Sequence, residues 1–416
     1  MSADDRGRDS GALRWSIYLL FFLFGGVTSL NDVLVPKLKG LFHLNFFQAN
    51  LVQVAFFGAY LLISLPAAAL VKRIGFLRSA SVGLLVMTAG CLLFAPASAA
   101  ATFWMFLAAL FVLAAGVTVV QVVTNPLISM LGPQDSAPSR LTFAQAFNAL
   151  GTTIFPFVGA QLILGSLQKV DVSSLTGAAL TAFRTHETQV VVSAYFGLAL
   201  TLAAIAGFVW LGRNSFKEDA PPEQGLLSGF GLLKQPRFAF GAACIFLYVG
   251  AEVAIGSNLT NYLMQASTLG LAAVAAGKLT AFYWGGAMVG RFIGSAAMQR
   301  FAPNRVLIGV ALGAASLLLV SGLSQGVVSG YAIIAIGLCN SIMFPTIFSL
   351  ASAGLGPRAA DGSGIICVAI VGGAIIPPLT GQVADMGGLR LALIVPALCY
   401  LVIAAFGRFC GQRSAV

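Results

Sequence analysis

Long runs of apolar residues, separated by short polar stretches, make up almost the whole chain. A helix that crosses a membrane needs about 20 mostly apolar residues. Runs of that length occur near residues 15–35, 49–71, 77–97, 101–131, 142–165, 189–212, 238–265, 271–299, 304–323, 328–352, 362–384 and 389–408. The pattern therefore predicts an all-α membrane protein with twelve transmembrane helices.

The small number of charged residues supports this class. Only 9% of the 416 residues are charged, whereas soluble domains carry about 25%. The net charge of +10 does not indicate a nucleic-acid partner, because the basic residues are scattered among short loops without interleaved aromatics. The six cysteines show no CxxC spacing, so we expect neither a disulfide framework nor a zinc site. The polar start leads directly into the first apolar run, and we expect no cleaved signal peptide.

Residues 213–237 concentrate charge, Pro and Gly, and they divide the runs into two sets of six. We expect an N-terminal tail (1–14), a six-helix bundle (15–212), a cytoplasmic linker (213–237), a second six-helix bundle (238–408) and a C-terminal tail (409–416). The halves also share motifs: NPLISMLGP (125–133) resembles part of FPTIFSLASAGLGP (344–357), and GTTIFPFVGAQ (151–161) resembles GGAIIPPLTGQ (372–382). Repeats in the same direction, six helices apart, are typical of the major facilitator architecture.

The positions of Lys and Arg predict the orientation. Most of the 23 basic residues fall in segments that share a side of the membrane with both termini. By the positive-inside rule, both termini are expected to face the cytoplasm. The exceptions are Lys37, Lys39, Lys169, Arg184 and Arg390 on the opposite side, and Lys278 and Arg291 within a span.

Asp32 is an acidic residue inside the first apolar run, beside Asn31. A carboxylate at the centre of a span costs at least about 2.5–3.5 kcal/mol, so intramembrane acids usually have a function. Asp32 either faces a water-filled cavity and binds a cation, or lies near the outer interface beside Lys37 and Lys39. We favour the cation role.

Glu252 is the corresponding acidic residue in the second half, and it is followed by Asn258 and Asn261. Its carboxylate and these amides suit the recognition of sugar hydroxyls. Two further amide pairs have helical spacing: Gln121 with Asn125, and Gln145 with Asn148. Each amide either contacts a substrate or joins neighbouring helices.

Three glycines spaced four apart, Gly286, Gly290 and Gly294, predict a helix-packing face. Trp284 lies beside them and either stacks on a sugar or belongs to the interfacial aromatic belt. Catalysis is not expected, because the sequence shows no phosphate-binding loop, catalytic triad or metal cluster. We therefore expect no enzyme and no cofactor, and energy from an ion gradient or from the substrate's own concentration.

Several motifs resemble the fucose:proton symporter family, and most closely its bacterial glucose/galactose transporter branch. They are SLNDVLVPKLKGLF, QANLVQVAFFGAYLLISLPAAALVKRIGF, TNPLISMLGP, SRLTFAQAFNALGTTIFP, FYWGGAMVGRFIGS and SIMFPTIFSL. The resemblance covers nearly the whole chain. It implies the twelve-helix major facilitator fold and import of a hexose with a cation.

The resemblance also implies roles for individual residues. The family's membrane carboxylate matches Asp32, and its sugar-contacting Gln and Asn match Gln145 and Asn148. Two positions depart from the pattern, because Gln121 replaces a Glu and Phe344 replaces a Tyr. The loss of that Glu argues against a two-carboxylate proton relay, so the coupling ion is a proton or Na⁺.

Together these observations predict a cation-coupled hexose symporter in the bacterial inner membrane, sufficient as a monomer. Glucose or galactose is favoured over fucose, and an N-acetylated hexose is an alternative. The cation would bind Asp32 and Glu252. Residues expected to contact the sugar are Asn31, Gln121, Asn125, Gln145, Asn148, Asn258, Asn261, Trp284, Asn340 and Phe344. The rivals are a drug exporter, which needs an apolar cavity, and a non-transporting sugar receptor, which usually carries a signalling domain.

Overall fold

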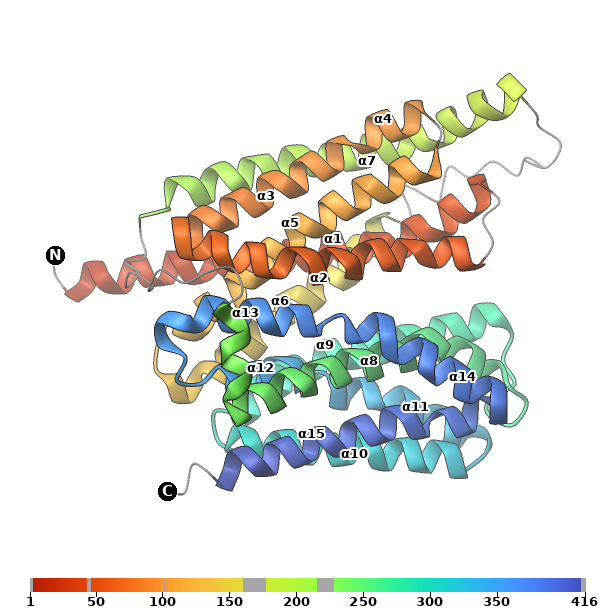
Figure 1. The fold of residues 1–416 in the computed structure, drawn as a ribbon. Helices are drawn as coiled ribbons and strands as arrows, with labels where there is room; N and C mark the ends of the chain where they lie inside the picture. The colour runs from red at the N-terminus through yellow and green to blue at the C-terminus, as the bar shows by residue number, and fades with distance from the viewer. Residues whose placement is uncertain (1–2, 43–45, 101, 160–176, 215–227, 413–416) are drawn as a thin grey trace. The chain divides into compact units, whose positions relative to one another are not determined.

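The computed structural model describes residues 3–42, 46–100, 102–159, 177–214 and 228–412, and no β-strand occurs within these ranges. The chain forms two compact units (Figure 1). The first contains residues 1–127 and 147–226, and the second contains residues 128–146 and 227–416. Two helices, α5 (Phe103–Met130) and α6 (Ala137–Gly159), each contribute residues to both units.

Within the described residues, the first half of the chain contains seven α-helices and a 3₁₀ turn. They are α1 (Ala3–Phe42), α2 (Phe46–Ile74), α3 (Phe76–Leu92), α4 (Phe94–Ala99), α5 (Phe103–Met130), η1 (Gln134–Ser136), α6 (Ala137–Gly159) and α7 (Gly177–Leu211). In the first unit α3 packs along α7. Gly83, Gly90 and Gly116 allow α3 and α5 to approach closely, because a methyl group at any of them would collide with the opposite helix.

Residues 228–412, the described part of the second half, contain eight α-helices and two 3₁₀ turns. They are η4 (Ser228–Lys234), α8 (Pro236–Met264), α9 (Ala273–Ala297), α10 (Pro303–Leu323), α11 (Gly326–Asn340), α12 (Met343–Ser352), η5 (Gly356–Arg358), α13 (Ala359–Ala369), α14 (Gly372–Ala392) and α15 (Ile394–Gln412). Helix α8 packs against α9, α14 and α15, and α10 packs against α11 and α15.

Ten helical stretches of the described chain are long and apolar enough to cross a membrane. The two other expected spans correspond to α6 and α9, which carry polar and charged side chains such as Gln145 and Arg291. The expected spans at 328–352 and 362–384 are each divided, into α11 with α12 and into α13 with α14. This arrangement is consistent with the predicted twelve spans of an all-α membrane protein.

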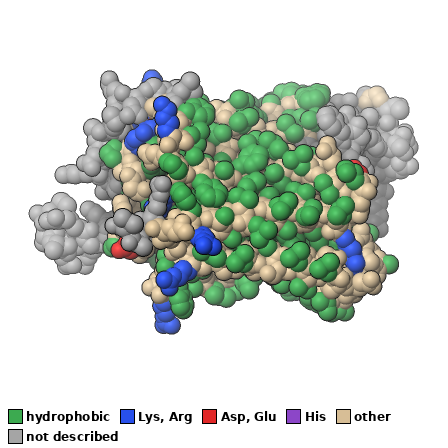
Figure 2. Space-filling model, turned by 60° about the horizontal axis from the view of Figure 1, so that its bottom comes forward, with side chains coloured by type: hydrophobic (Ala, Val, Ile, Leu, Met, Phe, Trp, Pro, Cys, Tyr) green, Lys and Arg blue, Asp and Glu red, His purple; other side chains and the backbone are tan. Residues whose placement is uncertain are grey.

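The outer surface of the second unit is apolar, as a lipid-facing surface requires. Helices α10 and α15 leave Leu312, Leu319, Leu398 and Leu401 largely exposed. Hydrophobic side chains cover the middle of the face in Figure 2, and the Lys and Arg side chains lie toward its ends. The protein is therefore a multi-pass membrane protein.

Residues 228–237, the end of the region expected as a linker, pack within the second unit. The hydroxyl of Ser228 lies 3.3 Å from both carboxylate oxygens of the buried Asp361, at the start of α13. Arg358 donates to the Ser228 carbonyl (2.9 Å) and lies 3.8 Å from the Asp361 carboxylate. Helix α8 then begins at Pro236, because a proline in the first turn needs no backbone donor.

Candidate functional site

Glu252 lies at the centre of a hydrogen-bonded cluster within the second unit. The hydroxyl of Tyr248, one turn earlier on α8, donates to Glu252 Oε1 at 2.8 Å and lies 3.1 Å from the carbonyl oxygen of Asn340. The hydroxyl of Tyr283 donates to the backbone carbonyl of Glu252 at 3.3 Å. Among the described residues, no group donates to Oε2, which leaves this oxygen for a ligand.

Asn340 joins four helices through its backbone and side chain. Its Nδ2 donates to the Tyr283 hydroxyl on α9, and its Oδ1 accepts from the Tyr400 hydroxyl on α15, both at 2.7 Å. Its carbonyl is the one that lies near Tyr248 on α8. The side chain is fully buried. The amide expected to contact a sugar therefore bonds to two tyrosines. These bonds fix the side chains that surround Glu252.

Arg291 is a partly buried cation on α9, two turns after Tyr283. Its Nε donates to the carbonyl of Ser341 at 3.3 Å, and one terminal nitrogen donates to the carbonyl of Gln145 at 3.0 Å. The guanidinium therefore joins the end of α11 to the α6 backbone within the second unit.

Trp284 brings an exposed aromatic ring close to this cluster. The ring contacts Tyr283 edge to face, with centroids 5.0 Å apart. It also covers Gly256, where an added Cβ would lie 2.7 Å from the indole Cζ2. Gly256 is one turn after Glu252, so the ring and the carboxylate lie along the same face of α8. About half of the Trp284 side chain, 47%, is exposed.

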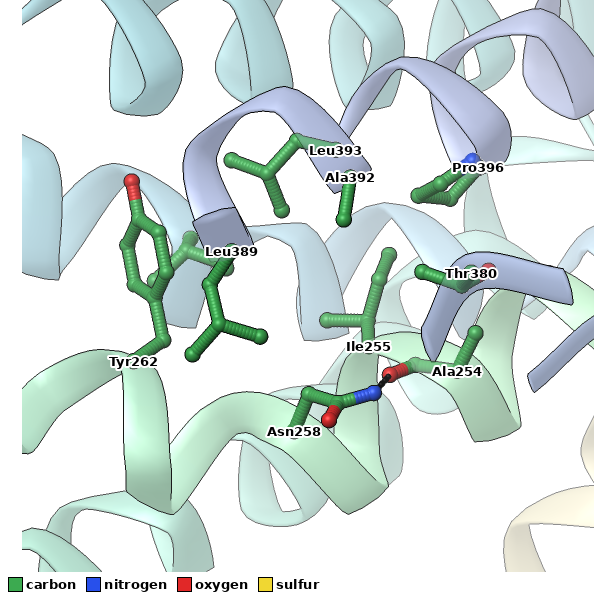
Figure 3. A pocket seen from close by; sticks show the side chains of 10 residues that line it. Ala254, Ile255, Asn258, Tyr262, Thr380, Leu389, Ala392, Leu393 and Pro396 are labelled. Atoms are coloured by element: carbon green, nitrogen blue, oxygen red, sulfur yellow. Dashed lines mark hydrogen bonds between the residues drawn. The ribbon is translucent and has the colours of Figure 1, made fainter. Parts of the chain in front are cut away.

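Asn258 and Asn261 lie apart from Glu252. Asn258 Nδ2 donates to the Ala254 carbonyl at 2.9 Å, and its side chain lines a small cavity of about 20 Å³ (Figure 3). The other lining residues are mostly apolar: Ala254, Ile255, Tyr262, Ile333, Thr380, Leu389, Ala392, Leu393 and Pro396. Asn261 is exposed. Phe344 is buried on α12 and stacks on Phe348.

In the first unit, Gln121 is held by a tyrosine. The Tyr60 hydroxyl donates to Gln121 Oε1 at 2.6 Å, and both side chains are buried. Asn125 is fully buried one turn later on α5. Tyr60 was not among the expected site residues, although a buried tyrosine usually needs a partner for its hydroxyl. The need of a buried tyrosine hydroxyl for a partner is therefore the feature that could have pointed to the Tyr60–Gln121 pair.

Gln145 and Asn148 belong to different units although both lie on α6. Asn148 Nδ2 donates to the Phe21 carbonyl of α1 at 3.3 Å. Gln145 is buried, and its carbonyl accepts from Arg291. Helix α1 includes Asn31 and Asp32, but the side chains of these two residues lie outside the described part of the structure.

The glycines of α9 form a packing face, as predicted. A methyl group at Gly286, Gly290 or Gly294 would come within 3.3 Å or less of Leu338, Ser341 or Ile342 respectively. The reciprocal contact is at Gly337 of α11, where a Cβ would collide with the carbonyl oxygen of Tyr283. Close packing of α9 on α11 therefore places Tyr283 against Asn340.

Comparison with known proteins identifies the family. The family model described as Major Facilitator Superfamily matches residues 17–371. The glucose/galactose transporter of Brucella abortus is 46% identical over 400 residues, which cover 96% of this chain and 94% of that protein. The L-fucose-proton symporter of Escherichia coli K12 is 35% identical over 413 residues, which cover 95% of this chain and 92% of that protein.

A solved structure gives the same result. The crystal structure of the transporter FucP in the outward conformation has a TM-score of 0.89 and 31% identity, and the match covers 97% of this chain and 99% of that one. These proteins are transporters rather than enzymes, in agreement with the expectation from the sequence. The family resemblance drawn from the sequence motifs is thereby confirmed. This chain belongs to the Major Facilitator Superfamily.

Proposed function

We propose that the protein is a cation-coupled symporter that imports a hexose across the bacterial inner membrane by alternating access. The names of its relatives support this substrate class, because one is a glucose/galactose transporter and another an L-fucose-proton symporter. We also propose that a monomer suffices and that both termini face the cytoplasm.

The observation that carries the proposal is the position of the Trp284 ring, which comes from α9 and covers Gly256 of α8, one turn after Glu252. A sugar presents hydroxyl donors at its edges and an apolar C–H surface on each face of its ring. The free Oε2 of Glu252 accepts a hydroxyl, and the exposed indole of Trp284 stacks on the C–H surface.

The coupling cation is proposed to bind carboxylates inside the membrane. Asp32 and Glu252 are the acidic residues of the chain that lie in the interior of apolar runs. A carboxylate in hydrocarbon gains most from a cation, either as a proton that neutralises it or as a Na⁺ ion. Binding of that cation would then bias which side of the membrane the sugar site faces.

The deciding experiment is uptake of labelled sugars into proteoliposomes, with proton and Na⁺ gradients imposed separately. Glucose, galactose, fucose and N-acetylglucosamine form the panel. We expect one gradient to drive accumulation of a hexose above its external concentration. A thermal shift with lipophilic cations, together with no uptake of any sugar, would instead favour a drug exporter.

Asp32→Asn tests the cation site. The amide keeps the size of the side chain but cannot take up a proton and binds Na⁺ more weakly. We expect gradient-driven accumulation to be lost, while exchange of labelled for unlabelled sugar persists, because exchange needs no net movement of the cation. Full accumulation by this variant would remove Asp32 from the coupling mechanism.

A further inference from the structure

The start of α10 and the end of α15 lie side by side in the second unit (Figure 1). Gly407 of α15 allows the close approach, because a Cβ there would lie 3.0 Å from the carbonyl oxygen of Asn304 and 2.7 Å from Ile308. A Cβ at Gly411, one turn later, would collide with the side-chain amide of Asn304. Asn304 and Gly407 therefore face each other, and the two helices run in opposite directions.

Each of these contact residues is followed by an exposed arginine, Arg305 on α10 and Arg408 on α15. Consecutive residues of an α-helix are turned by about 100° about the helix axis, always in the same sense. Because the two helices are antiparallel, a step of one residue from the contact leads to the same side of the pair on both helices. The two arginine side chains therefore leave the pair on one side and at the same end.

That side of the helix pair is also its apolar outer surface. Residues seven apart lie almost on one line along an α-helix, because a turn contains about 3.6 residues. Within α10 and α15, the other members of the lines through Arg305 and Arg408 are all apolar and about half exposed: Leu312, Leu319, Leu401 and Ile394. Two apolar lines thus run along the lipid-facing surface, and each ends at an arginine.

The two guanidinium groups have no partner within the described part of the chain. Neither Arg305 nor Arg408 forms a hydrogen bond or an ion pair there, and α10 and α15 contain no acidic residue. Residues 253–416 include only two acids, Asp361 and Asp385. Asp361 is buried beside Arg358, and Asp385 precedes the start of α15, far along the helix from its basic end. The positive charge is therefore not offset by the protein.

The corresponding helix pair of the first unit gives its arginines protein partners. Helices α3 and α7 are the third and sixth spans of the first half, as α10 and α15 are of the second, and they also pack together. Arg78, in the first turn of α3, donates to Asn214 Oδ1 at 3.3 Å. Arg213, just after α7, lies over the Trp210 ring, 5.0 Å from its centroid, and donates to the Trp210 carbonyl at 3.0 Å. The absence of such contacts is thus particular to the α10–α15 pair.

We propose that Arg305 and Arg408 bind the phosphate of an anionic phospholipid whose acyl chains lie along the two apolar lines. Arginine donates parallel hydrogen bonds to phosphate oxygens, and these bonds are strengthened by charge. A headgroup without an ammonium group complements two cations that no acid offsets, whereas phosphatidylcholine carries a cation of its own. Basic residues at the end of a membrane-spanning helix are well placed to reach such headgroups. With both termini inside, as proposed above, the lipid belongs to the cytoplasmic leaflet.

The test is lipid binding to the purified full-length protein in detergent, measured by native mass spectrometry. The probes are dioleoylphosphatidylglycerol and dioleoylphosphatidylcholine, which share their acyl chains and differ in headgroup charge. We expect Arg305→Gln combined with Arg408→Gln to weaken binding of the anionic lipid roughly 30-fold, and to change binding of the zwitterionic lipid much less. Arg305→Lys with Arg408→Lys keeps the charge without the forked donor geometry, so its affinity should be intermediate.

Arg78→Gln combined with Arg213→Gln is the matched control, because it removes the same charge from the corresponding helix pair. Its affinity for phosphatidylglycerol should stay within about twofold of the parent's. Equal losses in the two double variants would mean that the lipid responds to net charge alone, and they would overturn the proposal. Equal affinity of the parent protein for the two lipids would overturn it as well.

Two further measurements separate the proposal from its alternatives. Arg408→Gln alone is expected to weaken phosphatidylglycerol binding roughly fivefold, and it replaces the double variant if that variant unfolds in detergent. An unchanged affinity in this single variant would contradict the site. Inorganic phosphate at the lipid's concentration should not displace phosphatidylglycerol, because the acyl chains contribute to binding, and displacement would exclude a lipid as the occupant. None of these measurements involves sugar or transport, so their outcome is independent of the proposed function.

Discussion

Trp284 exposes about half of its side chain, whereas the adjacent Tyr283 is fully buried. This difference distinguishes a ring that fixes the structure from one that is free to contact a ligand. We expect Trp284→Ala to weaken hexose binding roughly 3- to 10-fold, because stacking of an aromatic ring contributes about 0.5–1.5 kcal/mol. Equilibrium binding of the transported sugar to purified protein measures this effect.

Phe282→Ala is the matched control, because this residue is on the same helix and is 65% exposed. It lies two positions before Trp284, so its side chain points to a different side of α9. The same loss of affinity in both variants would mean that Trp284 acts through helix stability and does not contact the sugar.

The hydroxyl of Tyr400 has a structural role. It is fully buried, and it supplies the hydrogen bond to Asn340 Oδ1. We expect Tyr400→Phe to lower the free energy of unfolding by about 1–3 kcal/mol, since the amide oxygen loses its partner without access to water. Thermal unfolding in detergent measures the change. Tyr331→Phe, at an exposed position on α11, should leave the melting temperature unaltered.

The junction of α9 and α11 depends on the absence of a side chain at Gly337. A Cβ at this position would collide with the carbonyl oxygen of Tyr283. Gly337→Ala is therefore expected to push the helices apart and to destabilise the fold by about 1–3 kcal/mol. Gly309→Ala on α10 is the control, because no atom lies within 4 Å of a Cβ there. Equal melting temperatures for the two variants would contradict this account of the helix junction.

Helices were more predictable from the sequence than their contacts. Apolar runs and the Gly286 series locate spans and a packing face, because both depend on local spacing. The division between Asn340 and Met343 and the pairing of Tyr60 with Gln121 depend on residues far apart in the chain. For the same reason the sequence did not reveal that Asn340, which is expected at the sugar site, bonds to Tyr283 and Tyr400 of other helices.

The distribution of Lys and Arg along the whole chain predicts the orientation of the protein in the membrane. Of 36 charged residues, 23 are Lys or Arg, and most of these fall on the side of the two termini. Insertion keeps short basic loops in the cytoplasm. The turn between α9 and α10, with Arg300, is then cytoplasmic, and the turn between α10 and α11, with Gln325, faces outward.

Cysteine labelling tests this orientation, because Gln299 and Gln325 are exposed at opposite ends of α10. An impermeant maleimide should label Gln325→Cys in intact cells, but Gln299→Cys only after permeabilisation. The parent protein is the blank, since five of its six cysteines are buried and Cys339 is partly so. The opposite labelling pattern would place Lys37 and Lys39 in the cytoplasm and reverse the direction proposed for sugar entry.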